Sequence, residues 1–222
     1  MTRGLILDLD DTLYLERDFV RSGFLAVAEE ASTTGVDASE IFEFLWAGFI
    51  QGGRGDAFDR LAVRWPEIGQ RVGVASLVRT YRVHQPLIEM SDPGFPQMAR
   101  DHIAVLGLIT DGTVSTQMNK LRALGLENTF DVRVITGAWG PGFYKPNHRA
   151  FESVESSLGL AGPRLIYVAD NPAKDFVAPN ERGWESVRIR RQGQLHENAE
   201  PDGSHAAPRH EVRSLSEVLE IL

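Results

Sequence analysis

The hydrophobic pattern of this chain changes character along its length. Residues 4–10, GLILDLD, begin with a continuous apolar run and end in acids, which predicts a short buried strand. From 16 to about 88, apolar residues recur at helical spacing, and Asp37 with Glu40 three residues later forms a candidate capping box. The helices expected in this region are 16–33, 37–50, near 56–64 and near 74–84.

From residue 104 onward, short apolar runs alternate with helical patterns. The predicted strands are 104–112, 132–136, 164–170 and 185–190. The predicted helices are 115–126, 147–159, 173–183 with an interruption at Pro179, and 214–222. Between them, the polar stretch 193–211 is interpreted as a surface loop. Strands that alternate with helices favour parallel order and right-handed crossovers.

These elements predict the α/β fold class, with an open parallel Rossmann-like sheet, helices on both of its faces, and an all-helical cap inserted after the first strand. The expected division is a core formed by 1–15 and 89–222 and a cap formed by 16–88. A chain of 222 residues is long enough for one domain with such an insertion.

Composition narrows the function. The chain has no cysteine, which excludes a disulfide framework, a thiolate metal site and a cysteine nucleophile, and which suits a cytoplasmic location. Its net charge of -8 makes nucleic acid and anionic membranes improbable partners. No apolar stretch approaches the roughly 18 to 20 residues of a membrane helix, and no signal segment is expected. An acidic protein with an anionic substrate needs a local positive group.

Polar side chains follow the predicted strands. In open α/β sheets the working site lies beyond the carboxyl ends of the strands, so these groups are expected to meet at one edge. Alternation along a strand places Asp8 and Asp10 on the same side. The full set is Asp8 and Asp10 from the first strand, Thr110, Asp111 and Gly112 from the next, Lys145 from a later loop, and Asp170 and Asp175 after the fourth.

The residue types indicate phosphoryl chemistry. Carboxylates from two strand ends form a hard-oxygen site of the kind Mg²⁺ prefers, and such an ion would attract phosphate. Lys145 and Thr110 can hold the phosphate oxygens, with help from the backbone N–H groups of Asp111 and Gly112. One free carboxylate can attack phosphorus to form an aspartyl-phosphate, and another can transfer the proton.

Four motifs in this order resemble those of the haloacid dehalogenase (HAD) superfamily of aspartyl-phosphate-forming hydrolases. Ala169 departs from the family pattern, because it stands where a glycine is usual. The resemblance extends over nearly the whole chain. The motifs read DLDDT at 8–12, LGLITDG with Thr110, YKPN with Lys145, and VADNPAKD with Asp170 and Asp175.

The resemblance implies a role for each residue. Asp8 would be the nucleophile and a metal ligand, and Asp10 the general acid/base with its backbone carbonyl on Mg²⁺. Asp170 would be the third protein ligand. Thr110 and Lys145 would hold the transferred phosphoryl group. Asp175 would orient Lys145 or bind the metal through water, although an acid early in a helix is also favoured by the helix dipole.

The main hypothesis is therefore an Mg²⁺-dependent phosphatase that acts on a small phosphorylated metabolite, such as a sugar phosphate or nucleoside monophosphate, as a monomer or homodimer. A receiver-like phosphoacceptor domain is one alternative, against which the helical insertion and the acid at Asp10 argue. Phosphomutase or dehalogenase chemistry on the same fold is another. Dehalogenases of the family generally lack an acid at the position of Asp10. A relative that only binds ligand is the last alternative.

Several other residues invite weaker interpretations. Arg54, in a Gly-rich break of the cap, could reach an anionic substrate, but a solvated loop arginine is the favoured reading. Asp11 is interpreted as a turn residue. His196, His205 and His210 follow no compact zinc-binding spacing.

Overall fold

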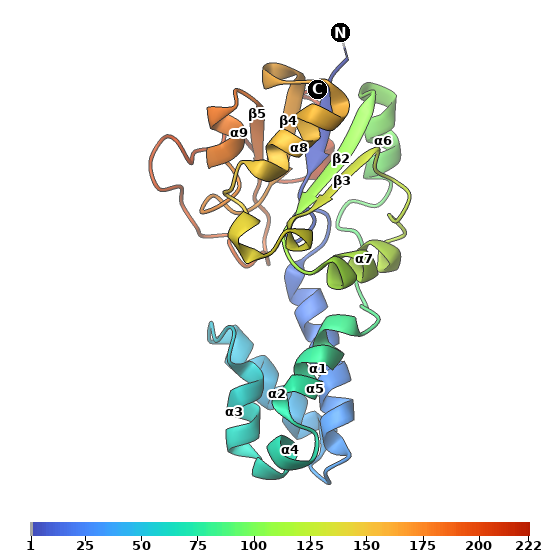
Figure 1. The fold of residues 1–222 in the computed structure, drawn as a ribbon, viewed down its shortest axis with the longest axis vertical. Coiled ribbons are helices and arrows are strands. Elements are labelled where there is room, and N and C mark those ends of the chain that lie inside the picture. The colour runs from blue at the N-terminus through green and yellow to red at the C-terminus, as the bar shows by residue number, and fades with distance from the viewer. Residues whose placement is uncertain (1) are drawn as a thin grey trace. The chain divides into compact units, whose positions relative to one another are not determined.

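The computed structural model describes residues 2–222, within which six strands form one parallel sheet in the order β3-β2-β1-β4-β5-β6 (Figure 1). The strands β2 and β4, which flank β1, are joined to the strand that precedes each of them by crossover connections, as expected for parallel order. The α/β class with a Rossmann-like sheet is confirmed. The strands are β1 (Gly4–Leu7), β2 (Val105–Thr110), β3 (Val132–Ile135), β4 (Leu165–Ala169), β5 (Glu185–Ile189) and β6 (His210–Val212).

The chain divides into two compact units, one formed by residues up to Arg17 with Ile88–Leu222, and one formed by Asp18–Leu87. The first unit holds the sheet. Its helices are α6 (Phe95–His102), α7 (Val114–Ala123), α8 (Arg149–Leu158), α9 (Val177–Glu181) and α10 (Leu215–Val218), with single 3-10 turns at Thr136–Ala138, Pro141–Phe143 and Gly162–Arg164. Within residues 2–222, no helix is both long and apolar enough to cross a membrane.

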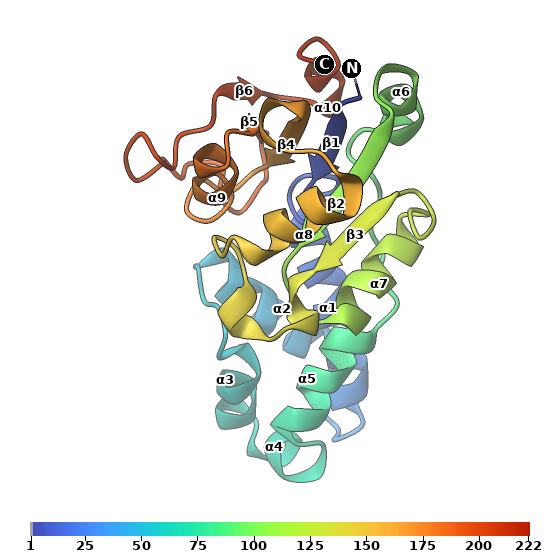
Figure 2. The same cartoon turned by 45° about the horizontal axis from the view of Figure 1, so that its top comes forward.

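Both faces of the sheet are covered. On one face, α8 packs against β2 and β3, an arrangement that Figure 2 shows clearly. There, the ring of Phe151 lies edge-on to Tyr167 and Trp184, at centroid distances of 5.1 and 5.4 Å. Leu5 and Leu7 of β1 point to the opposite face and are buried as well. Burial on both faces explains why β1 reads as a continuous apolar run.

The second unit is helical, which agrees with the predicted all-helical insertion after the first strand. Its helices are α1 (Glu16–Ser32), which begins in the first unit, α2 (Ala38–Ile50), α3 (Ala57–Arg64), α4 (Pro66–Arg71) and α5 (Val74–Val83). Asp37 caps α2, because its carboxylate accepts hydrogen bonds from the backbone N–H groups of Ser39 and Glu40. Phe24 packs with Phe49 and Tyr81 in its core.

The structure corrects the sequence interpretation at several elements. The helices α4 and α6 were not expected, because each is short and has a proline in its first turn, and short segments with proline are usually interpreted as loops. The predicted loop 193–211 ends in a strand, since β6 pairs with β5 at the edge of the sheet. Pro179 does not interrupt α9, because it lies in the first turn, where a missing N–H breaks no helical hydrogen bond.

Candidate active site

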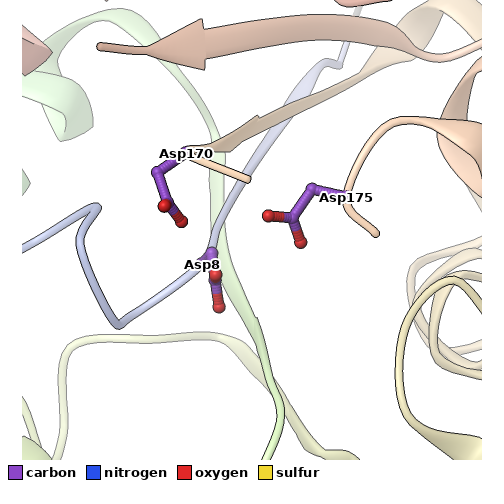
Figure 3. A group of neighbouring side chains, drawn as sticks. All are labelled: Asp8, Asp170 and Asp175. Atoms are coloured by element: carbon purple, nitrogen blue, oxygen red, sulfur yellow. The ribbon is translucent and has the colours of Figure 1, made fainter. Parts of the chain in front are cut away.

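Carboxylates from two neighbouring strands meet at the carboxyl edge of the sheet. Asp8 directly follows β1 and Asp170 directly follows β4, and these two strands are paired. Asp175 comes from the segment after β4, and Figure 3 shows the three side chains as close neighbours, with the carboxylates of Asp170 and Asp175 facing one another. One oxygen of each lies within 4.8 Å of the others. The structure therefore brings Asp8 of the first motif together with Asp170 and Asp175 of the fourth.

Lys145 places a cation among these acids. Its Nζ lies 2.9 Å from Oδ1 of Asp8 and 2.7 Å from Oδ1 of Asp175, and it donates a hydrogen bond of 2.9 Å to the Tyr167 hydroxyl. Burial alone would lower the pKa of Lys145, but Asp175 and Asp8 outweigh it and hold that pKa above its usual range. Lys145 is therefore a fixed positive charge beside Asp8.

Both carboxylate oxygens of Asp175 contact other groups of the protein. Its Oδ1 pairs with Lys145, and its Oδ2 accepts a hydrogen bond of 3.0 Å from the backbone N–H of Asn171. Since both oxygens already have donors, Asp175 is better suited to orient Lys145 and the loop after β4 than to bind a metal directly.

Asp8 and Asp170, unlike Asp175, have carboxylate oxygens that lack hydrogen-bond donors within the described part of the chain. Both are buried, and among the described residues Oδ2 of Asp170 has no hydrogen-bond partner, while Oδ1 of Asp8 has only its ion pair with Lys145. Burial raises the pKa of Asp8 to about 6 against the opposing effect of Lys145, and burial together with Asp175 raises the pKa of Asp170 well above its usual value. Buried, undersatisfied carboxylate oxygens fit a hard divalent cation such as Mg²⁺.

The carboxylate of Asp10 lies in a separate network. Its Oδ1 accepts from the Tyr14 hydroxyl and lies 2.7 Å from Nζ of Lys120, while its Oδ2 accepts a bond of 3.0 Å from Nε2 of Gln117. Burial would raise the pKa of Asp10, but Lys120 together with the hydrogen bonds from Tyr14 and Gln117 outweighs burial and lowers that pKa. The side chain of Asp10 is therefore held apart from the cluster of Asp8, Asp170 and Asp175.

Thr110, at the end of β2, is fully buried, and its hydroxyl accepts a hydrogen bond of 2.5 Å from Gln117 Nε2. The side chain of the next residue, Asp111, accepts two hydrogen bonds. Its Oδ1 accepts from the Thr136 hydroxyl at 2.7 Å and from the backbone N–H of Lys145 at 3.1 Å. Asp111 thus fixes the loop that carries Lys145, a role that the sequence interpretation did not assign.

The turn at Gly112 is tightly enclosed. Gly112 has a φ of 110°, a conformation that favours glycine. A side chain at Gly137 would meet the carbonyl oxygen of Gly112 at 1.9 Å, so only glycine allows the loop after β3 to approach this closely. The close approach brings the loop that leads to Lys145 against the turn after β2.

Two charged residues near the site were not expected. The Nζ of Lys174, in the fourth motif, lies 3.4 Å from Oδ2 of Asp111. Glu16, at the start of α1, has its pKa raised to about 7, chiefly by burial and then by Asp10. Spacing alone could not identify them, because neither lies directly at a strand end.

The segment after β5 also contacts the acid-bearing turns, which corrects its interpretation as a surface loop. Gln194 is buried, and its Nε2 donates to the carbonyl oxygens of Asp11 at 2.5 Å and Ile189 at 3.2 Å. The buried guanidinium of Arg188 donates to the carbonyl oxygen of Asp170 at 3.0 Å. These residues hold the backbone of the first and fourth motifs in place through hydrogen bonds to its carbonyl oxygens.

Asp11 adopts a left-handed conformation with a φ of 53°, which aspartate tolerates better than most residues. Its carboxylate accepts from the backbone N–H groups of Glu16 and Leu195, both at 2.7 Å. It is therefore a turn residue.

In the helical unit, Arg54 donates to the carbonyl oxygens of Phe49 and Gly53, and its guanidinium lies 4.1 Å from the centre of the Phe49 ring. A role for Arg54 in substrate binding stays a prediction.

Comparison with known proteins points to the same family as the four motifs do. A family model described as haloacid dehalogenase-like hydrolase matches residues 2–180. A glyceraldehyde 3-phosphate phosphatase of Methanocaldococcus jannaschii is 29% identical over 203 residues, which cover 85% of this chain and 85% of that protein. A phosphoserine phosphatase of Thermus thermophilus is 32% identical over 120 residues, or 54% of this chain and 45% of that protein.

Solved structures share the fold. A magnesium-bound HAD hydrolase of Bacillus subtilis aligns over 100% of this chain and 98% of its own, with a TM-score of 0.68 and 20% identity. A 2-haloacid dehalogenase of Pseudomonas syringae pv. Tomato aligns over 100% and 98%, with a TM-score of 0.64 and 18% identity. At these identities the similarity shows the fold alone, and the choice of reaction has to come from the site.

Proposed function

This chain belongs to the haloacid dehalogenase-like hydrolases and is a phosphoric monoester hydrolase, and we propose that it dephosphorylates a small metabolite through an aspartyl-phosphate on Asp8, with Mg²⁺ as cofactor. The observation that carries the proposal is the grouping of Asp8 with Lys145 and Asp170 at one sheet edge, with Asp10 two residues along. A nucleophile, a phosphate-holding cation, a metal ligand and a proton-transfer group are then all present.

In the first step, a carboxylate oxygen of Asp8 attacks phosphorus while the bond from phosphorus to the ester oxygen breaks. The carboxyl group of Asp10, in the protonated form that this step requires and that Lys120 disfavours, gives its proton to the leaving oxygen, so the alcohol departs neutral. Lys145 and Thr110 hold the phosphoryl oxygens during transfer. The products of this step are the free alcohol, the aspartyl-phosphate of Asp8 and the carboxylate of Asp10.

In the second step, a water oxygen attacks the phosphorus of the aspartyl-phosphate. Asp10, now a carboxylate, takes the proton from this water, and the bond between phosphorus and Asp8 breaks. Inorganic phosphate leaves, and both acids return to their starting states. The same residue thus acts first as an acid and then as a base.

The residues fit a resident Mg²⁺ ion. The carboxylates of Asp8 and Asp170 and the backbone carbonyl of Asp10 would hold it, and Asp175 would support them from behind. When bound, the ion supplies positive charge that neutralises the clustered acids and stabilises charge on the transferred phosphoryl group. Lys145 alone cannot neutralise the clustered acids, because its single positive charge is already paired with two carboxylates.

The substrate is proposed to be a small phosphoester. The relatives named glyceraldehyde 3-phosphate phosphatase and phosphoserine phosphatase suggest three-carbon esters as the first compounds to examine, beside sugar phosphates and nucleoside monophosphates. The helical unit is proposed to be a substrate-selecting cap that excludes water during the reaction. The lack of cysteine supports a cytoplasmic location, and the active form is proposed to be a monomer or homodimer.

The test is release of inorganic phosphate from a panel of these esters, with Mg²⁺ or with a chelator, by the parent and by Asp8→Asn. We expect turnover that needs Mg²⁺ and falls to background in the variant. Halide release from a 2-haloacid and activation by a sugar bisphosphate, measured in parallel, would favour the dehalogenase and phosphomutase alternatives. An Asp8→Asn variant as active as the parent would overturn the assignment of the nucleophile.

A further inference from the structure

We infer that Gln117 and Lys120 of α7 are positioning residues that hold the carboxyl group of Asp10 in the orientation needed for proton transfer. The inference rests on the proposed function, in which Asp10 is the acid and base. Neither residue belongs to the four motifs that predict the site.

Lys120 is a buried charge with a specific contact. Its side chain is only 5% exposed, and its Nζ lies 2.7 Å from Oδ1 of Asp10. A buried ion pair is often no more stabilising than apolar side chains of the same size, because both ions lose their hydration. On the buried face of α7, next to Leu121, an apolar residue would satisfy packing. The contact with Asp10 therefore points to a role in holding that side chain.

Gln117 connects Asp10 to the phosphate-binding side of the site. It is buried, and its Nε2 donates to Oδ2 of Asp10 at 3.0 Å and to the hydroxyl of Thr110 at 2.5 Å. A side-chain amide has two N–H donors, so one group can make both bonds. The proton-transfer group and the proposed phosphate-binding hydroxyl are thus linked through one side chain.

Together these contacts occupy both oxygens of Asp10. Lys120 and Tyr14 contact Oδ1, and Gln117 contacts Oδ2. Gln117 and Lys120 are one helical turn apart, which places both on the same face of α7. Proton transfer requires the carboxyl group within hydrogen-bond distance of the reacting oxygen, so a carboxyl group that can rotate freely is a poorer catalyst.

The two chemical steps should respond differently when the contacts that hold Asp10 are removed. When the leaving group is p-nitrophenolate, it departs without a proton, so transfer of phosphate to Asp8 does not need Asp10 as an acid. Attack by water on the aspartyl-phosphate still needs Asp10 as a base. A variant with a displaced Asp10 should therefore form the intermediate at the normal rate and hydrolyse it slowly.

The experiment is rapid-quench kinetics with p-nitrophenyl phosphate and with the panel ester that the parent hydrolyses fastest, using Lys120→Met and Gln117→Leu. We expect a burst of one nitrophenolate per active site, followed by turnover at least about 10-fold slower than in the parent, within the usual size of acid–base effects. With an alkyl ester, both steps need Asp10, so a slow reaction without a burst is expected. Lys120→Arg should recover part of the rate, since arginine can also donate to a carboxylate.

Arg122→Met is the matched control. Arg122 is on the same helix, and its ion pair with Glu127 is exposed to solvent, so this variant should behave as the parent does in both phases. Unchanged kinetics in both Lys120→Met and Gln117→Leu would overturn the inference. An equal decrease of burst and steady-state rates, together with a lower Tm, would also overturn it, in favour of a purely structural role. A parent that hydrolyses no phosphoester would overturn the proposed function itself.

Discussion

Nζ of Lys145 lies 2.9 Å from Oδ1 of Asp8, and both side chains are almost fully buried. Asp175 shares the same ammonium group at 2.7 Å. The pairing places a fixed cation beside the proposed nucleophile, and this cation together with a bound Mg²⁺ would offset the clustered acids at this sheet edge. It also makes Lys145 important for the stability of the site.

Replacement of Lys145 by methionine is expected to destabilise the protein and to inactivate it. The substitution leaves Asp8 and Asp175 buried beside each other without their shared ion-pair partner, and breaking such a buried pair costs about 3–5 kcal/mol. Urea denaturation in the presence of a chelator measures the change in the free energy of unfolding. Phosphate release by the same variant should fall to background, even at temperatures where it is fully folded. A stable, active Lys145→Met variant would contradict the assigned role.

Magnesium should stabilise the folded protein without substrate. A ligand that binds only the folded state raises its stability by an amount that grows with the ligand concentration, and about 100 times Kd gives about 2.7 kcal/mol. We expect Mg²⁺ to raise the Tm of the parent and to leave that of Asp170→Asn unchanged, because the variant lacks the oxygen that has no other partner. Asp202→Asn, at an exposed position, is the control and should respond as the parent does.

Glu16 predicts how stability changes with pH. Burial, with help from Asp10, raises the pKa of Glu16 from 4.5 to about 7. The folded state therefore favours the protonated form, so this contribution to stability is complete below about pH 4.5 and is lost as the pH rises through about 7. In a chelator, Glu16→Gln should become more stable relative to the parent between pH 5 and pH 8. A Tm difference that stays constant or decreases over this range would contradict the prediction.

Gln194 is expected to matter more for stability than its position in a polar stretch suggests. Its amide donates to the carbonyl oxygens of Asp11 and Ile189, and an unsatisfied buried polar group costs about 1–3 kcal/mol. Gln194→Ala should lower the free energy of unfolding by an amount in this range. Gln192→Ala removes the same side chain at an exposed position and should change little. Equal effects of the two substitutions would show that the contact with Asp11 has no structural importance.

The sequence predicted the sheet and its site because the relevant signals are local. The apolar run of β1 and the acids that follow it are adjacent in the chain, and parallel topology then brings the tips of neighbouring strands together. Thr110 and Asp170 could be placed by the same rule, since each lies at or directly after the end of a strand paired with β1.

The contacts around Asp10 and Asp11 could not be predicted in this way. Gln117 and Lys120 are separated from Asp10 by more than 100 residues, and their buried positions on α7 conflict with the usual exposure of polar side chains. The one available signal was a polar pair one turn apart in the helix that follows the Thr110 strand. The contact of Gln194 with Asp11 spans a still longer separation and follows no periodic pattern.

The phosphoryl group is proposed to pass through Asp8, and the most direct test is to trap it there. The parent enzyme is mixed with Mg²⁺ and the best substrate of the panel, quenched in acid within milliseconds, and digested for mass spectrometry. We expect one added phosphoryl group on the peptide that contains residues 4–14, at Asp8, and none in Asp8→Asn. A phosphoryl group on any other residue, or rapid turnover with no phosphorylated enzyme at any quench time, would contradict it.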